Sequence, residues 1–277
     1  MTGVDVGRQD AGAVGVQMWS QDPVRMVLPG AQWAGVLAGR PGVDVPPRFA
    51  VRPADAIPVP DTELARSRTD AVHRMIDVVD AAPVRVHVGS WGRGRATAAV
   101  VCVDGDRTVI LGSVGPEQGP GAGGAPSWVE VCAVRGRDAA AEVVRAGHPG
   151  LDAGSSRPGP VERSPEPVSR AWAAAIGDGD PDALRALLCD APQEEPDPVR
   201  ALAGSPTGGT AIRVEIRATG GGAAAAGWCG VWLATSDGTL VVRAAGVGAD
   251  REQHRVRLWW ATPGEVSRDV SAALTGR

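Results

Sequence analysis

The chain contains the same succession of short alternating runs twice, about 128 residues apart. VRVHV at 84–88 matches IRVEI at 212–216, with apolar residues at the same three positions and arginine second in both. Asp104-Gly105 followed by TVIL corresponds in the same way to Asp237-Gly238 followed by TLVV. Alternation of period two predicts half-buried strands, and Asp-Gly between two such runs predicts a hairpin turn. The period is too long for a solenoid, so we interpret the repeat as a duplicated unit of domain size. Chance similarity between two simple hairpin patterns is the alternative.

We therefore expect an α+β fold of two halves related by a pseudo-two-fold axis, each an antiparallel sheet packed with helices. The halves are 1–150 and 151–277, and the Gly-, Pro- and Ser-rich stretch 147–167 between them has the composition of a linker. Strands are predicted at 13–19, 84–88, 96–103, 107–113, 128–134, 211–218, 227–235, 239–245 and 254–260. Helices are predicted at 30–38, from Asp61 to Pro83, at 138–146, and from N-caps at Ser164, Asp180, Asp197 and Thr262.

Composition excludes several classes of function. The 277 residues are 43% hydrophobic and 22% charged, which is ordinary for a globular protein. All 28 positive residues are arginine, so a phosphate-binding loop or a Schiff base has no lysine to use. The net charge of −4 gives no basic surface for nucleic acid. The sequence shows no secretion signal and no apolar run long enough to span a membrane, so we expect a cytoplasmic protein without membrane insertion.

The candidate sites for ions and nucleotides fail on their spacing. The glycine-rich run at 119–124 has proline on both sides and precedes a strand, which favours a hairpin loop over a phosphate cradle. Asp178, Asp180 and Asp182 alternate as in a calcium loop, but the glycine and glutamate that such a loop requires are absent, and Asp180 is better explained as an N-cap. Four isolated cysteines predict reduced thiols. We therefore predict no metal site, no cofactor and no catalytic residues.

The high tryptophan content is the feature of the sequence that is least explained by the needs of folding alone. The chain has nine tryptophans, one phenylalanine and no tyrosine. Four indoles gather on the predicted strands of the second half: Trp228, Trp232, Trp259 and Trp260. Alternation places Trp228 and Trp232 on one face of the sheet and points Trp259 and Trp260 to opposite faces. Since tryptophan is enriched at binding hot spots, we predict these four residues as a partner-binding surface, with packing in the core as the alternative.

The order of elements resembles the EspG family, the chaperones associated with ESX (type VII) secretion in actinobacteria. The resemblance covers nearly the whole chain. It rests on the VPPRF crossing at 45–49, the long helix before VRVHV, the hairpin with its Asp-Gly turn, and WAAAIGDGDPDALRALL at 172–188 before the second set of strands. It implies a cytosolic chaperone, not an enzyme, that binds the apolar helical tip of a PE–PPE-like or WxG-like heterodimer and targets it for export. The loop at 90–95 is shorter than in mycobacterial members, so the client can differ. A self-associating scaffold, such as a homodimer, and an uncharacterised hydrolase are the alternatives.

Overall fold

The computed structural model describes residues 23–46, 49–50, 63–92, 95–116, 128–151, 166–178, 180–190, 198–217, 225–244, 255–261 and 264–275. Within these residues ten strands form one antiparallel sheet, in the order β1-β5-β4-β3-β2-β7-β8-β9-β10-β6. The strands are β1 (Val24–Pro29), β2 (Val84–Gly92), β3 (Arg95–Asp104), β4 (Arg107–Pro116), β5 (Trp128–Arg135), β6 (Glu166–Pro167), β7 (Gly208–Ile216), β8 (Ala225–Thr235), β9 (Gly238–Ala244) and β10 (Arg255–Trp260). The predicted α+β class and antiparallel pairing are confirmed.

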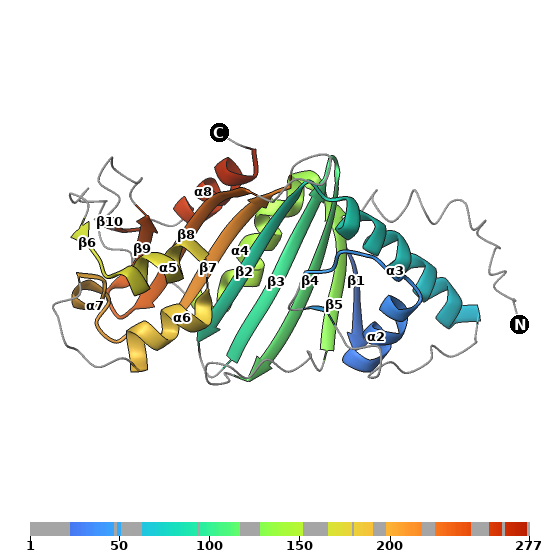
Figure 1. The fold of residues 1–277 in the computed structure, drawn as a ribbon, viewed down its shortest axis with the longest axis horizontal. Helices are drawn as coiled ribbons and strands as arrows, with labels where there is room; N and C mark the ends of the chain where they lie inside the picture. The colour runs from blue at the N-terminus through green and yellow to red at the C-terminus, as the bar shows by residue number, and fades with distance from the viewer. Residues whose placement is uncertain are drawn as a thin grey trace, which may run out of the picture.

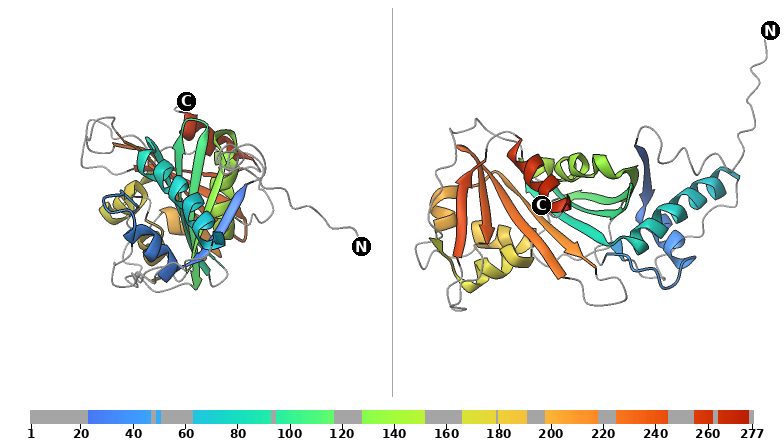
Figure 2. Two further views of the ribbon diagram at one scale, coloured as in Figure 1. Left: turned by 90° about the vertical axis from the view of Figure 1, so that its right-hand side faces the viewer. Right: turned by 90° about the horizontal axis from the view of Figure 1, so that it is seen from above.

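Helices cover both faces of this sheet (Figures 1 and 2). They are α2 (Gly30–Ala38), α3 (Glu63–Ala81), α4 (Ala139–Leu151), α5 (Arg170–Asp178), α6 (Pro181–Arg185), α7 (Pro198–Ala203) and α8 (Glu265–Thr275), with a 3₁₀ turn η3 (Gly136–Asp138) before α4 and a π-helical turn η4 (Ala186–Asp190) after α6. We call the side that carries α2, α3 and α5–α7 the front face, and the side that carries α4 and α8 the back face. No helix in the described ranges combines the length and apolarity needed to cross a membrane.

The middle of the sheet is the ladder between β2 and β7. These strands pair along their whole length, from Val84 opposite Ile216 to Gly92 opposite Gly208. Outward from this ladder, β2-β3-β4-β5 and β7-β8-β9-β10 are two meanders of the same order. The predicted Asp-Gly turns join β3 to β4 and β8 to β9, and Gly105 adopts φ +59°, in the left-handed region that favours glycine. The two predicted halves therefore share one continuous sheet.

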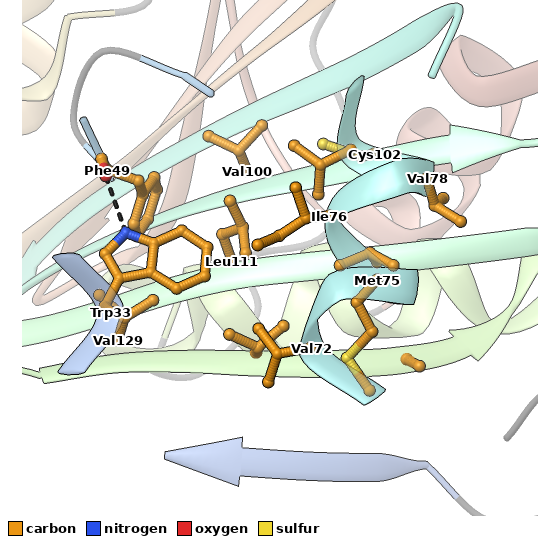
Figure 3. Packing of buried hydrophobic residues seen from close by; sticks show 14 of the residues in the cluster. Trp33, Phe49, Val72, Met75, Ile76, Val78, Val100, Cys102, Leu111 and Val129 are labelled. Atoms are coloured by element: carbon orange, nitrogen blue, oxygen red, sulfur yellow. Dashed lines mark hydrogen bonds between the residues drawn. The ribbon is translucent and has the colours of Figure 1, made fainter. Parts of the chain in front are cut away.

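The first-half core lies on the front face, beneath α2 and α3 (Figure 3). Helical spacing places Val72, Met75 and Ile76 on the buried side of α3, where they pack on β3, β4 and β5. Trp33 of α2 is fully buried, and its Nε1–H donates a hydrogen bond of 2.8 Å to the carbonyl oxygen of Phe49. This bond ties the segment that follows α2 to the core.

Two further cores complete the packing. On the back face, α4 and α8 pack on both halves of the sheet, including Val86, Val214 and Trp232. On the front face of the second half, α5–α7 pack on β7–β10 together with Trp91 of β2. Trp91 reaches across the central ladder and lies over Gly209 of β7. The back-face helices and this indole thus connect the two halves in addition to the ladder.

Most predicted elements are present within a few residues, and the exceptions are informative. Strand β1 was not predicted, whereas the predicted strand 13–19 lies outside the described residues. The helix expected from Ser164 begins instead at Arg170, where the Trp172 N–H donates to Ser169 Oγ at 3.4 Å, and β6 occupies Glu166–Pro167. The last helix begins at Glu265. Helix α4 extends to Leu151, into the stretch expected as linker.

Candidate functional site

Three of the four predicted tryptophans gather on the back face of the second half. Trp228 and Trp232 share one face of β8, as alternation predicts, with ring centroids 5.7 Å apart and planes tilted by 45°. Gly230 between them makes this contact possible, because a Cβ there would lie 2.8 Å from Cη2 of both rings. Trp232 has 0% of its surface exposed. Its indole therefore offers no contact to a partner in this conformation, and packing in the core describes it better.

Arg243 of β9 holds the other indoles of this cluster in place. Its guanidinium carbon lies 4.9 Å from the ring centroid of Trp228 and 5.3 Å from that of Trp259. The same guanidinium donates to Asp269 Oδ2 of α8 at 2.7 Å. An arginine stacked on two aromatic faces and paired with a carboxylate is well fixed. The arrangement attaches α8 to the sheet, and Trp228 and Trp259 remain partly exposed beside it.

Trp260 points to the opposite face from Trp259, as predicted, and packs against the core beneath α5–α7. The structure thus brings Trp228, Trp232 and Trp259 together and separates Trp260 from them by the thickness of the sheet. Trp260 is partly exposed. The predicted surface is therefore two separate places, one on each face.

The middle of the front face carries a group of charged and polar side chains, whereas the rest of this face packs apolar side chains against helices. We call it the central polar cluster: Asp44, Arg85, His87, Arg213, Glu215 and Arg217. Arg85 donates to Asp44 Oδ2 at 3.1 Å, and Arg217 lies 2.8 Å from the same oxygen. His87 Nε2 and Glu215 Oε2 are 3.2 Å apart across the ladder. These contacts join β2, β7 and the segment after α2.

His87 is held in its neutral form by its surroundings. Burial is the largest cause and lowers its pKa from the ordinary value. Glu215 acts in the opposite direction, and the positive charges of Arg213 and Arg85 lower the pKa further. A neutral imidazole here keeps one donor and one acceptor for hydrogen bonding.

A small apolar patch lies at the other end of the sheet, on the back face. Val27 of β1 is 61% exposed and Trp128 of β5 is 53% exposed, on neighbouring strands. Beside them, Arg25 pairs with Glu130 at 2.7 Å and with Glu142 at 2.6 Å. These two side chains form a small exposed apolar area at the β1 edge.

The described residues offer little to metal or thiol chemistry. No group of three or more His, Cys, Asp or Glu side chains within them is arranged to hold a metal ion. Cys102, Cys132 and Cys229 form no disulfide within the described residues, in agreement with the predicted reduced thiols, and burial raises the pKa of Cys102 to about 12 and of Cys132 to about 11. Both thiols therefore stay protonated and unreactive at neutral pH.

Asp180, which the sequence offered as a calcium ligand or an N-cap, is an N-cap: its Oδ1 accepts a hydrogen bond from the Ala183 N–H at 3.3 Å.

Sequence reasoning did not single out the central polar cluster or Trp128. The signal for the cluster is present in VRVHV and IRVEI, where the charged residues alternate with valine and isoleucine on strands expected at the centre of a sheet. Polar residues on the inner face of such strands need a structural or functional reason.

No protein-family model and no curated protein matches the sequence.

Proposed function

We propose that this protein is a cytosolic chaperone of type VII (ESX) secretion, which binds the apolar helical tip of a PE–PPE-like or WxG-like substrate and keeps it soluble for export. The proposal rests on the resemblance to the EspG family. The observation that carries it is the order of strands in the sheet.

The strand order is symmetric about the β2–β7 ladder when each strand of the first half is matched with its counterpart in the second half. Exchanging β1 with β6, β5 with β10, β4 with β9, β3 with β8 and β2 with β7 leaves the sequence of neighbours unchanged. In each half an edge strand is followed by helices, a central strand, a meander outward and a final helix. This is the connectivity expected of two copies of one unit, and it supports the duplication proposed from the sequence.

The register of the central ladder supports a two-fold axis. A shift of about 128 residues relates Val86 to Val214 in the sequence, and these two residues also lie opposite each other in the ladder. A pair that is both equivalent and directly opposed is expected on a two-fold axis. A pseudo-two-fold pair of α+β halves is what the family resemblance implies.

Co-expression with candidate clients tests the proposed function directly. The tagged protein is purified with PE–PPE-like or WxG-like heterodimers, and the mass of the product is measured by size-exclusion chromatography with light scattering. We expect one copy of each chain in the complex, and a client whose apolar tip residues are replaced by serine serves as the control. Equal capture of both clients, or no capture of any such client by the folded protein, refutes the proposal.

The predicted tryptophan surface is tested in the same complex. Truncation of a hot-spot tryptophan costs about 2 kcal/mol of binding or more, whereas loss of a core tryptophan costs about 3–5 kcal/mol of folding. Trp228→Ala, Trp259→Ala and Trp260→Ala are therefore measured for both quantities. Normal client binding by all three folded variants removes this surface from the proposal.

A self-associating scaffold is the second candidate, and the apolar patch at the β1 edge favours it. β1 pairs on one side with β5, and Val27 and Trp128 are exposed beside it. Among the described strands β1 is an edge strand, and edge strands promote pairing between chains. Light scattering of the purified protein over a range of concentrations distinguishes the candidates: a dimer that Val27→Arg converts to monomer favours the scaffold.

A further inference from the structure

Two arginines occupy matching positions in the duplicated strands. Arg85 is the second residue of VRVHV and Arg213 the second residue of IRVEI. The residues that follow them, Val86 and Val214, belong to the back-face core, so alternation places both arginines on the front face. The two halves thus present the same side chain on either side of the central ladder, and its surroundings can be compared.

Arg85 has its acceptors within the chain. One terminal nitrogen donates to Asp44 Oδ2 at 3.1 Å. The other donates to the carbonyl oxygens of Asp44 at 2.8 Å and Val79 at 3.0 Å. Only 4% of its surface is exposed. The segment after α2 and the end of α3 therefore neutralise and cover this arginine.

Arg213 has no such acceptors. In the described part of the chain its guanidinium makes no hydrogen bond and no ion pair, and its Nε is buried without a partner. Nε of Arg85 also lacks a partner, so the difference lies in the terminal nitrogens. A guanidinium stays charged at every physiological pH. The terminal nitrogens of Arg213 are not among the buried unpaired atoms, so they remain accessible to an acceptor from outside the chain.

Both carboxylates of the central polar cluster already have other partners. Asp44 lies between Arg85 and Arg217, at 3.1 and 2.8 Å. Glu215 faces His87 at 3.2 Å. Glu215 lies at hydrogen-bond distance from a neutral His87 and makes no ion pair with Arg213, so Arg213 is the arginine of the central polar cluster that has no ion pair within the described residues. The planar guanidinium fork matches the two oxygens of a carboxylate, which bind it with two parallel hydrogen bonds.

The position favours a carboxylate carried by a protein. His87, Arg213 and Glu215 are partly exposed, whereas Gly89 and Ala211, the next row toward α6, are buried. In Figure 1, β2 and β3 face the viewer between α3 and α6. A small acid bound to these partly exposed side chains would keep part of its surface in water. A protein surface laid over the strands excludes that water and strengthens a charge-assisted hydrogen bond.

We propose that Arg213 binds the carboxylate of an aspartate or glutamate on a protein partner that docks across β2 and β7 on the front face. The identity of the partner as the secretion client rests on the proposed function; the carboxylate site itself does not. The pseudo-symmetric arrangement gives it a simple form: Arg85 receives its carboxylate from the chain itself, and Arg213 receives the equivalent one from the partner.

The first test needs no client. Arg213→Gln and Arg85→Gln are compared by thermal unfolding, with Arg68→Gln on the exposed side of α3 as the matched control. Arg85→Gln leaves Asp44 without its buried partner and is expected to lower Tm by several degrees. Arg213→Gln breaks no contact within the described residues, so its Tm is expected to stay the same or rise, as at functional positions that are not optimised for stability. A loss of Tm as large as that of Arg85→Gln makes Arg213 a structural residue and overturns the proposal.

The second test uses acetate as the carboxylate probe on the full chain. The Nε–Hε resonance of Arg213, identified by its absence in Arg213→Gln, is followed during titration with sodium acetate at constant ionic strength. We expect a saturable shift with acetate and none with chloride. An unsaturable shift, or an equal shift with chloride, overturns the proposal.

The third test uses the client complex. Arg213→Gln is expected to weaken client binding about tenfold, and Arg68→Gln less than about twofold. An Asp→Asn or Glu→Gln change on the client that weakens binding of the wild type, but not of Arg213→Gln, identifies the paired carboxylate. Normal client binding by Arg213→Gln overturns the proposal. If acetate binds at Arg213 and no client is captured, the carboxylate site stands and the proposed function fails.

Discussion

Replacement of Trp232 by alanine tests whether this residue belongs to the core. The indole is 0% exposed, contacts Trp228 at a centroid distance of 5.7 Å, and packs beneath the back-face helices. Removing a fully buried tryptophan costs about 3–5 kcal/mol, from lost burial and from the cavity that remains. Nε1 of Trp232 is buried without a hydrogen-bond partner, which costs about 1–3 kcal/mol in the native protein. Trp232→Phe removes that unpaired donor together with part of the ring, so we expect it to destabilise far less than Trp232→Ala.

The assay is urea unfolding followed by far-UV circular dichroism, because nine tryptophans make fluorescence hard to interpret. Trp128→Ala is the matched control, since this indole is 53% exposed and its loss is expected to change the free energy of unfolding by less than about 1 kcal/mol. The slope of free energy against urea should remain the same in every variant. A loss below about 1 kcal/mol for Trp232→Ala, or an equal loss for Trp128→Ala, refutes the assignment of Trp232 to the core.

Three further predictions concern contacts described above. Arg243→Ala removes the cation that stacks on two indoles and pairs with α8, so the free energy of unfolding should fall by about 1–3 kcal/mol; a fall below about 0.5 kcal/mol contradicts the stacking. Burial lowers the pKa of His87, so the unfolded chain takes up its proton first, and stability should fall as pH falls below about 6.5; His87→Gln should flatten this part of the pH profile of unfolding free energy. Gly209→Ala places a Cβ 2.2 Å from Cη2 of Trp91 and should cost about 1–3 kcal/mol, whereas Gly112→Ala, with 3.8 Å to its nearest neighbour, should cost much less.

The elements that the sequence predicted well are those whose local pattern agrees with their final environment. The stripe on α3 has helical spacing, and VRVHV and IRVEI alternate because one face of each strand packs on α4 and α8. Strand β1 was missed because VRMVLP is short and ends in proline, so its identity depends on pairing with β5, more than a hundred residues away. The pairing of β2 with β7 is likewise a long-range choice that no local pattern contains.

The candidate site was harder to predict for the same reason. Alternation correctly placed Trp259 and Trp260 on opposite faces, but it contains no information on which face a helix covers. Trp232 is closed off by back-face helices that follow two other strands of the sheet. The contrast between Arg85 and Arg213 depends on Asp44, a residue from an irregular segment with no periodicity to read.

The central ladder has a consequence for how the chain acquires its fold during synthesis. β2 leaves the ribosome long before β7, because about 120 residues separate the two strands. Until residues 208–216 emerge, the growing chain presents β2 as a nine-residue strand with one unpaired edge, next to a meander that can already be complete. On a polysome, β7 of a neighbouring chain can pair with this edge of β2 in the same register as the chain's own β7. We therefore expect exchange of second halves between nascent chains to be the main assembly error of this topology, and to increase when translation is crowded.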